Sequence, residues 1–309
     1  MNIEKYLSEN LSINISALHS FSRTAPHRYK VYSIPKRNSK GERIIAHPSK
    51  ELKFIQKMII KKLTDILPLH ESVISYRKKK SIVNNVIPHL NSSFLLKIDL
   101  KDFFPSIEPD LFFEQCKLLD IHFSDNDKKL LTGFLFWRNR KSSKLQLSIG
   151  APSSPLISNF ILYRFDDRIT KLCASYNVNY TRYADDLSFS TISNSILLKL
   201  SEEISAMLQE IFQGRFLINH EKTIFSSKAS NRHITGITIT NSGEMSLGRN
   251  FKRNISACIH KFTLNQLPQE ELLKLKGHLS FFKHVEPYFI LRMESKYGKH
   301  ILDKIRKSQ

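Results

Sequence analysis

Cysteine is scarce in this 309-residue chain and occurs only at Cys116, Cys173 and Cys258. An odd number of widely separated thiols predicts neither a zinc site nor a disulfide framework, so we expect reduced thiols in a cytoplasmic protein. The first residues lack the apolar core of a signal peptide, and no apolar run approaches the ~18 residues of a membrane span. We therefore expect neither a secreted protein nor a membrane partner.

Acidic residues are also in deficit, with 28 Asp and Glu against 48 Lys and Arg, which gives a net charge of +20. Residues 20–80 hold 16 Lys or Arg against 4 Asp or Glu, and residues 246–309 hold 13 against 5. These two flanks carry +12 and +8, and the rest of the chain is neutral. A uniformly basic surface would serve solubility alone, whereas two basic flanks favour a chain that grips a polyanion.

Two adjacent carboxylates, Asp185 and Asp186, lie between two extended stretches. Residues 179–182 precede them, and apolar side chains alternate with serine in residues 187–191, the pattern of a half-buried strand. We therefore expect the pair at the tip of a β-hairpin. An isolated pair would indicate only a turn, because Asp favours turns. The two carboxylates repel each other, however, unless a cation lies between them.

A second apolar stretch, residues 94–98, also ends in a carboxylate, that of Asp99. Two strands that end in acids can bring Asp99 beside Asp185 and Asp186. Three carboxylates at one point need hard divalent cations, and Mg²⁺ with substrate phosphates suits them best. Two such ions, ~3.5–4 Å apart, carry out phosphoryl transfer in polymerases. The three Asp residues are therefore the predicted catalytic and metal-binding set.

The block Tyr-Ala-Asp-Asp at residues 183–186, with Asp-x-x-x-Phe-Phe at residues 99–104, resembles the catalytic motifs of reverse transcriptases. The resemblance implies an α+β fold shaped like a right hand, with an antiparallel palm sheet, helical fingers and a small helical thumb. It implies N-terminal helices and fingers in residues 1–93, a palm in residues 94–245 with finger helices at about 108–140, and a basic helical thumb in residues 246–309.

The same resemblance assigns residues to the metals and the incoming nucleotide. Leu100 would add its backbone carbonyl to the ligands of two Mg²⁺ ions. Arg43, in a basic hairpin over residues 29–46, would hold the triphosphate; the alternative is a solvated basic turn. Phe104 would stack under the sugar and exclude a 2′-hydroxyl; the alternative is a core phenylalanine, since the chain has 21.

Two further positions follow from family blocks. Gly150 opens the sequence Gly-Ala-Pro-Ser-Ser-Pro, which lines the template and nucleotide pocket in the family. Ile149 stands where relatives usually have the Gln that touches the nucleotide sugar, which puts the detail of that pocket in question. Lys222 matches a lysine that can donate a proton to pyrophosphate; the alternative is an exposed lysine in a turn.

Two short segments resemble signatures of the retron branch of the family. Asn85 and His89 match Asn-Ala-x-x-His, with valine in place of alanine, and Ile234-Thr235-Gly236 matches Val-Thr-Gly. Because both segments lie outside the catalytic acids, we expect Asn85, His89, Thr235 and Gly236 to serve binding of a cognate RNA. We also expect Gly236 to permit a close backbone approach.

The retron resemblance implies a specific reaction and its partners. Such an enzyme recognises its own structured non-coding RNA, primes from the 2′-hydroxyl of one guanosine, and copies part of the RNA with dNTPs. The product is a branched RNA–DNA hybrid (msDNA), and an effector protein encoded nearby joins it in anti-phage defence. The alternatives are another bacterial reverse transcriptase, of the group II intron or diversity-generating type, and a scaffold that holds a hybrid and an effector.

Apolar spacing predicts the helices that surround these motifs. The final 60 residues combine helical spacing, basic residues and aromatics, which fits a thumb that follows a duplex backbone. We expect no RNase H or endonuclease domain after it. The predicted helices cover residues 50–67, two segments within 108–137, residues 154 to about 176, and residues 195–213.

Overall fold

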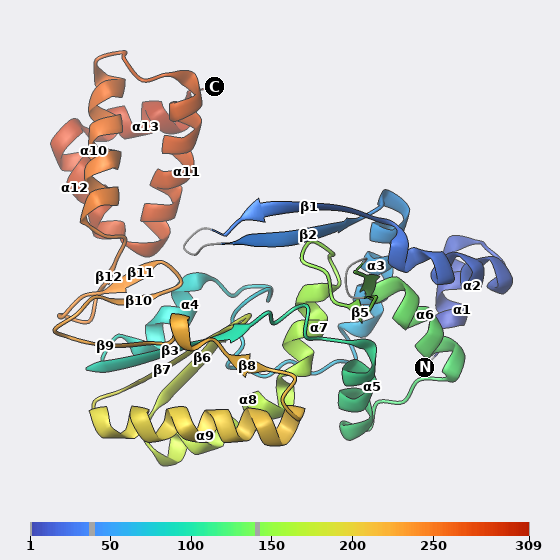
Figure 1. Ribbon diagram of the computed structural model, residues 1–309. Coiled ribbons are helices and arrows are strands. Elements are labelled where there is room, and N and C mark those ends of the chain that lie inside the picture. The colour runs from blue at the N-terminus through green and yellow to red at the C-terminus, as the bar shows by residue number, and fades with distance from the viewer. Residues whose placement is uncertain (1, 37–40, 140–142, 309) are drawn as a thin grey trace.

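The computed structural model describes residues 2–36, 41–139 and 143–308. It has the architecture of a right hand: a central antiparallel sheet, a helical region with a projecting hairpin on one side, and a helical bundle on the other (Figure 1). None of the helices within the described ranges combines the length and apolar character that crossing a membrane requires.

The central sheet, called the palm sheet here, is organised around β3. This strand pairs antiparallel with β7 on one side and with β8 and β9 on the other, and β6 extends the sheet beyond β7. The antiparallel palm sheet expected from the sequence is therefore present. Its strands are β3 (Phe94–Lys101), β6 (Asn179–Tyr183), β7 (Asp186–Thr191), β8 (Leu217–Ile218) and β9 (Ile224–Ser227).

Three helices cover one face of the palm sheet, where α9 lies beneath the strands in Figure 1. The apolar side chains of β3 that face them, Leu96, Ile98 and Leu100, are buried in the main core. One helix was predicted from residue 154 to about 176, and this is wrong: the backbone leaves helical geometry at Leu162 (φ −86°, ψ 4°) and two helices result. The helices are α7 (Ser154–Ile161), α8 (Tyr163–Ser175) and α9 (Asn194–Phe212).

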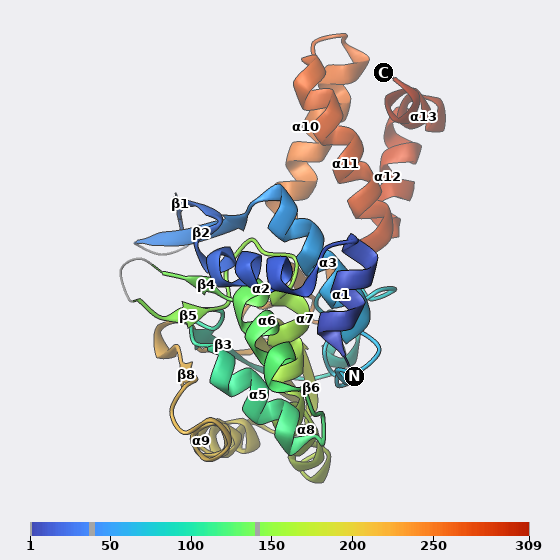
Figure 2. The ribbon, with the colours of Figure 1, turned by 90° about the vertical axis from the view of Figure 1, so that its right-hand side faces the viewer.

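The fingers combine helices with a long two-stranded hairpin. In Figure 1 the hairpin of β1 and β2 extends from the helices toward the C-terminal bundle, and Figure 2 shows the helices gathered on one side of the molecule. The basic turn at residues 37–40 lies outside the described residues. The elements are α1 (Ile3–Leu11), α2 (Ile15–Thr24), η1 (Ala25–His27), β1 (Tyr29–Pro35), β2 (Glu42–Pro48), α3 (Lys50–Leu63), α5 (Pro109–Leu118), α6 (Asp125–Leu135), β4 (Trp137–Arg138) and β5 (Leu145–Gln146).

The C-terminal bundle has its own apolar core, which also includes Val86 and Leu95 from the palm side. A small three-stranded sheet and the short helices α4 and η2 connect the bundle to the palm. The connecting elements are α4 (Ile82–Val86), η2 (Ile87–His89), β10 (Arg232–Ile234), β11 (Ile237–Ile239) and β12 (Met245–Ser246), whereas η3 (His220–Lys222) lies against β3 in the palm. The bundle comprises α10 (Arg249–Thr263), α11 (Gln269–Val285), α12 (Pro287–Tyr297) and α13 (Lys299–Lys307).

Candidate active site

The Asp pair lies at the tip of the hairpin formed by β6 and β7, as its sequence pattern predicts. Tyr183 and Asp186 form the last pair of the ladder, so Ala184 and Asp185 make the turn. Ala184 has a φ of +57°, a left-handed conformation that is unfavourable for a residue with a Cβ. This turn therefore needs support from its surroundings.

The third carboxylate arrives from the neighbouring strand. Asp99, near the end of β3, is the register partner of Asp186. The backbone N–H of Leu100 donates to the carbonyl of Asp185 over 3.2 Å, which ties the turn to β3. The juxtaposition of the three acids expected from two acid-tipped strands is thus observed.

Their electrostatics show a local excess of negative charge. Burial raises the pKa of Asp185 to about 6, and the neighbouring carboxylates of Asp186 and Asp99 add to this shift. Burial also raises the pKa of Asp186, Lys97 opposes the shift, and Asp99 adds to it. The site therefore favours a bound cation or a proton over bare carboxylates.

Asp99 has two polar partners of its own. Lys222 donates from Nζ to both carboxylate oxygens, at 3.0 and 3.2 Å, and Asn219 donates from Nδ2 to Oδ1 at 3.0 Å. Lys222 was assigned to the nucleotide from a family block, and η3 holds it at the acids. Asn219 was missed by the sequence analysis, although it lies only three residues before Lys222.

The acids suit a divalent cation in charge and donor type. Carboxylate oxygens are preferred ligands of Mg²⁺. Burial first, and then the carboxylates of Asp186 and Asp99, raise the pKa of Asp185, so a nearby cation would stabilise its charged form. Lys222 supplies a single positive charge, on Asp99. Within the described ranges, no group of three or more His, Cys, Asp or Glu side chains converges tightly enough to form a ready metal cage. The oxygen donors therefore fit the ion in kind and charge, whereas their present arrangement, with Lys222 on Asp99, is not a closed metal site.

Arg43 and Tyr76 lie within electrostatic range of this tip. Burial raises the pKa of Tyr76, the charges of Asp185 and Tyr183 raise it further, and Arg43 lowers it. The rings of Tyr76 and Tyr183 are 6.4 Å apart, and Tyr76 has a φ of +58°. Arg43 is exposed on β2 and is close enough to Tyr76 to influence its pKa. Nothing in the sequence pattern indicated Tyr76.

Phe104 and Gly150 occupy different surroundings. Phe104 is partly buried, packs against the main core, and meets Phe103 edge-on with ring centres 5.6 Å apart. Gly150 has a φ of +123°, and a Cβ there would come within 3.1 Å of the carbonyl oxygen of Ala46 in β2. Gly150 therefore lets the base of the fingers hairpin pack closely on this turn.

Asn85 and His89 are not placed to contact RNA, which corrects the expectation for both side chains. They are 0% and 1% exposed. The two ring nitrogens of His89 hydrogen-bond the hydroxyls of Ser190 (2.7 Å) and Thr181 (2.8 Å), so the ring joins η2 to the middle of the β6–β7 hairpin. Burial lowers the pKa of His89 to about 3, which keeps the ring neutral.

Thr235 and Gly236 form the turn between β10 and β11, with φ values of +46° and +83°. The expectation that Gly236 allows a close backbone approach is wrong, because a Cβ there would meet nothing within 4 Å. Its positive φ is the feature that suits glycine. Gly236 is exposed, whereas the Thr235 hydroxyl is buried and has no hydrogen-bond partner among the described residues.

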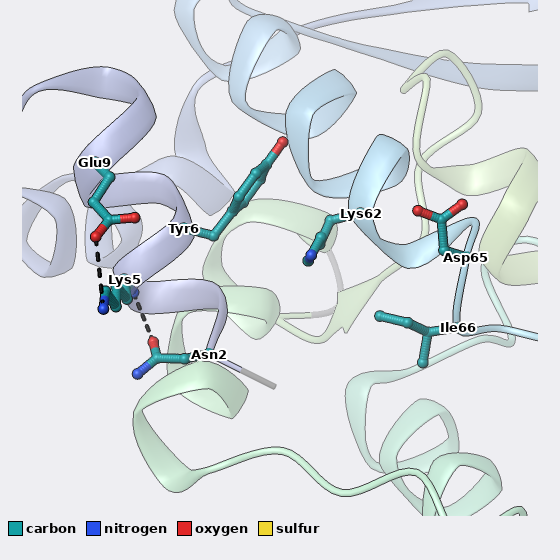
Figure 3. Close-up of a pocket in the computed structure, with 7 residues that line it drawn as sticks. All are labelled: Asn2, Lys5, Tyr6, Glu9, Lys62, Asp65 and Ile66. Atoms are coloured by element: carbon teal, nitrogen blue, oxygen red, sulfur yellow. Dashed lines mark hydrogen bonds and ion pairs between the residues drawn. The ribbon is translucent and has the colours of Figure 1, made fainter.

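A surface pocket elsewhere in the molecule does not share these properties. Figure 3 shows it between α1 and the end of α3, with the ring of Tyr6 along one side and Lys62 near it. Its four charged residues, Lys5, Glu9, Lys62 and Asp65, balance each other, so the pocket does not favour a polyanion.

Comparison with known proteins agrees with the geometry of the palm. The family model described as reverse transcriptase (RNA-dependent DNA polymerase) matches residues 34–239. The retron Ec83 reverse transcriptase of Escherichia coli is 42% identical over 93% of this chain and 92% of its own. The retron Ec86 enzyme of E. coli is 32% identical over 99% and 94% of the two chains, and the retron Mx65 enzyme of Myxococcus xanthus is 27% identical over 92% and 68%.

Among solved structures, apo telomerase from Candida tropicalis is similar with a TM-score of 0.50 at 13% sequence identity. The match covers 90% of this chain and 61% of the telomerase chain, so the present chain spans about three fifths of that protein. At this identity the likeness concerns the fold.

Proposed function

This chain belongs to the reverse transcriptase family, within it to the retron enzymes, and is an RNA-directed DNA polymerase; we propose that it copies its own structured non-coding RNA into branched RNA–DNA. The observation that carries the proposal is the meeting of Asp99, Asp185 and Asp186 at one end of the palm sheet. Synthesis would start from the 2′-hydroxyl of one guanosine and use dNTPs, and the product would be an RNA–DNA hybrid.

Asp99 and Asp185 would hold two Mg²⁺ ions, with Asp186 in support and the Leu100 carbonyl as a further ligand. When bound, Mg²⁺ supplies positive charge to the reacting phosphate and makes the primer hydroxyl more acidic. Asn219 would orient the Asp99 carboxylate through its 3.0 Å hydrogen bond. Lys222, half exposed beside Asp99, would carry the proton that the leaving pyrophosphate takes up.

The remaining assigned residues would shape the nucleotide pocket. Arg43 would attract the triphosphate from β2, and the Phe104 ring would lie under the sugar. Gly150 would let the hairpin of β1 and β2 lie close to the nucleotide pocket, since it allows the close contact with Ala46 of β2. Residues 1–93 would act with the finger helices, residues 94–245 as palm, and residues 246–309 as thumb.

RNA binding would depend mainly on the two basic flanks, residues 20–80 and the thumb, because Lys and Arg contacts to phosphates dominate such interfaces. Asn85, His89 and Thr235 would act on RNA placement only through the packing of palm against thumb. We further propose a cytoplasmic enzyme whose branched product works with an effector protein in anti-phage defence.

The test is to express the chain with the DNA that flanks its gene and to isolate the nucleic acid that copurifies. After RNase treatment, we expect DNA joined to a short RNA through a 2′,5′-linkage, and debranching enzyme should release it. Asp99→Asn should yield RNA without attached DNA, and the surface control Asp167→Asn should match wild type. Linear DNA alone, or branched DNA from Asp99→Asn, would overturn the proposal.

A further inference from the structure

Behind the catalytic turn, on the helix-covered face of the palm sheet, lies a buried ion pair. Arg182 on β6 and Asp166 on α8 are both 0% exposed. The guanidinium donates from Nε to Oδ1 at 2.8 Å and from Nη2 to Oδ2 at 2.6 Å, a bidentate contact. Tyr180 also donates its hydroxyl to Asp166, at 2.7 Å. The bidentate contact thus neutralises the two charges and also fixes the orientation of the Arg182 guanidinium.

The remaining donors of Arg182 connect this pair to the turn itself. Nη1 donates to the carbonyl of Ala184 at 3.1 Å and to Oδ1 of Asn159 at 3.2 Å, and Nη2 donates to the Asn159 carbonyl at 3.1 Å. All the donor directions of the guanidinium are therefore used. A lysine, with a single ammonium, cannot reproduce this set.

A second connection reaches the same turn from Ser75. Its hydroxyl accepts a hydrogen bond from the Ala184 N–H at 2.8 Å and donates to Oδ1 of Asn159 at 3.4 Å. Asn159 in turn donates from Nδ2 to the Ser75 carbonyl at 2.9 Å. Nearby, the chain pairs with β6: Ile74 donates its N–H to the Arg182 carbonyl at 2.9 Å. Both backbone groups of Ala184 are thus held by one buried network.

The position of this network explains why it is needed. Ala184 is in the left-handed region, and the residue after it is Asp185, whose carboxylate is repelled by Asp186 and Asp99. Strain and repulsion both act to open the turn. The two tethers on Ala184, from Arg182 and Ser75, oppose that motion from within the buried network.

We propose that Arg182, Asn159 and Ser75 are positioning residues that fix the catalytic turn, and that Asp166 holds Arg182 in place for this task. The proposal rests on the catalytic role given to Asp185 above. Loosening the turn should lower kcat, because a misplacement of ~1 Å at reacting groups costs on the order of a hundredfold in rate. It should leave the dNTP KM and RNA affinity nearly unchanged.

The informative variant is Ser75→Ala, which removes one tether and buries no charge. Its control is Ser158→Ala, because the buried Ser158 hydroxyl, among the described residues, hydrogen-bonds the Pro155 carbonyl of its own helix and does not reach Ala184. We expect Ser75→Ala to lower kcat by about tenfold on an annealed DNA primer and RNA template, with KM within about twofold. Hydrogen exchange should quicken in a peptide covering residues 180–187 and be unchanged in a peptide covering α10, residues 249–263.

A second pair of variants tests the guanidinium. Arg182→Lys keeps the charge beside Asp166 but loses the set of directed hydrogen bonds, and we expect kcat to fall by about a hundredfold. Its control is Arg168→Lys on α8, whose bidentate pair with Glu210 is exposed. We expect the control to retain wild-type kcat.

Two results would overturn the proposal. One is a Ser75→Ala variant with the same kcat and hydrogen exchange as Ser158→Ala. The other is a Ser75→Ala variant in which kcat, RNA affinity and melting temperature fall together while KM rises. Asp185→Asn is measured in the same series. If Asp185→Asn retains synthesis, the site assignment fails instead, so the two failures are distinguishable.

Discussion

The two faces of the β6–β7 hairpin are braced by different chemistry. On the face covered by α8, Arg182 and Asp166 form a charged network that ends on the backbone of the turn. On the opposite face, the neutral ring of His89 joins the hydroxyls of Thr181 and Ser190. Adjacent residues of one strand, Thr181 and Arg182, thus point into two unrelated networks because side chains alternate along a strand.

The difference shows what each network can control. The charged network reaches Ala184, next to the proposed catalytic acid Asp185, so under that proposal it bears on the geometry of the reaction. The His89 network contacts the middle of the hairpin and η2, which adjoins the core shared with the thumb through Val86. It therefore bears on how palm and thumb are joined. Only the His89 network contains a group that titrates near neutral pH when unfolded.

The largest expected effect comes from removing the positive charge of the first network. Arg182→Met leaves Asp166 buried without its partner, and such a change costs about 3–5 kcal/mol of folding free energy. Arg168→Met, in an exposed pair on the same helix, should cost less than about 1 kcal/mol. Urea unfolding of both variants measures the gap. Equal, small losses would mean that the Arg182 pair has no special structural role.

The second network should show a smaller loss of a different kind. His89→Ala takes one hydrogen-bond partner from each of two buried hydroxyls and leaves a cavity beside them, which should cost about 2–4 kcal/mol. DNA synthesis on the cognate RNA and on an arbitrary primed template should then fall together. His122→Ala, at an exposed histidine paired with Asp120, is the control. A loss confined to the cognate RNA would restore a direct role for His89 in RNA recognition.

Between the two faces, the acids themselves should oppose folding when no metal is present. The folded pKa of Asp185, about 6, exceeds its unfolded value of about 3.9, so the folded state binds the proton more tightly. The contribution of Asp185 to the free energy of unfolding is therefore favourable at low pH and is lost as pH rises through about 6. Asp185→Asn should therefore raise metal-free stability at pH 7.5 by on the order of 1–3 kcal/mol.

Thermal or urea unfolding in EDTA measures this effect, and Mg²⁺ should narrow the difference between wild type and Asp185→Asn. A variant less stable than wild type in EDTA would show that the carboxylate serves the fold. Asp167→Asn, at the protein surface, controls for the loss of one negative charge.

The smallest expected effect is the pH response of the His89 network. The folded pKa, about 3, lies below the unfolded value of about 6.5, so the stability that depends on the neutral ring is lost as pH falls below 6.5. Between pH 7.5 and 5.5 this amounts to about 1.4 kcal/mol. His89→Gln should remove that part of the pH dependence. Identical pH profiles for wild type and His89→Gln would contradict the buried, neutral assignment.

The sequence predicted the meeting of the three acids at one end of the palm sheet because the relevant signals are local. Two apolar strands that end in acids place Asp99 near Asp185 in an antiparallel sheet. The bracing residues carry no such signal: Arg182 finds Asp166 only after α8 packs on β6. Likewise, His89 matched a family signature, yet its burial depends on the packing of η2 against β6 and β7, which local pattern cannot place.

The fold shows the same limit at Leu162 and Tyr76. The apolar spacing from residue 154 onward continues across Leu162, so periodicity alone predicts one helix where the backbone breaks into two. Tyr76 lies near the site because its backbone has a positive φ, and a tyrosine at this position does not predict that conformation. Positions set by tertiary packing were therefore missed, whereas positions set by strand alternation were found.

The most direct test of the account is primer extension on an RNA template with Mg²⁺, comparing wild type, Asp185→Asn and Asp167→Asn. We expect Asp185→Asn to lose DNA synthesis by at least about a thousandfold while binding RNA with wild-type affinity, because its carboxylate serves the metal. Asp167→Asn, whose carboxylate pairs with Lys171 on the surface of α8, should match wild type. Synthesis by Asp185→Asn at the wild-type rate would contradict the assignment of the β6–β7 turn as the catalytic centre.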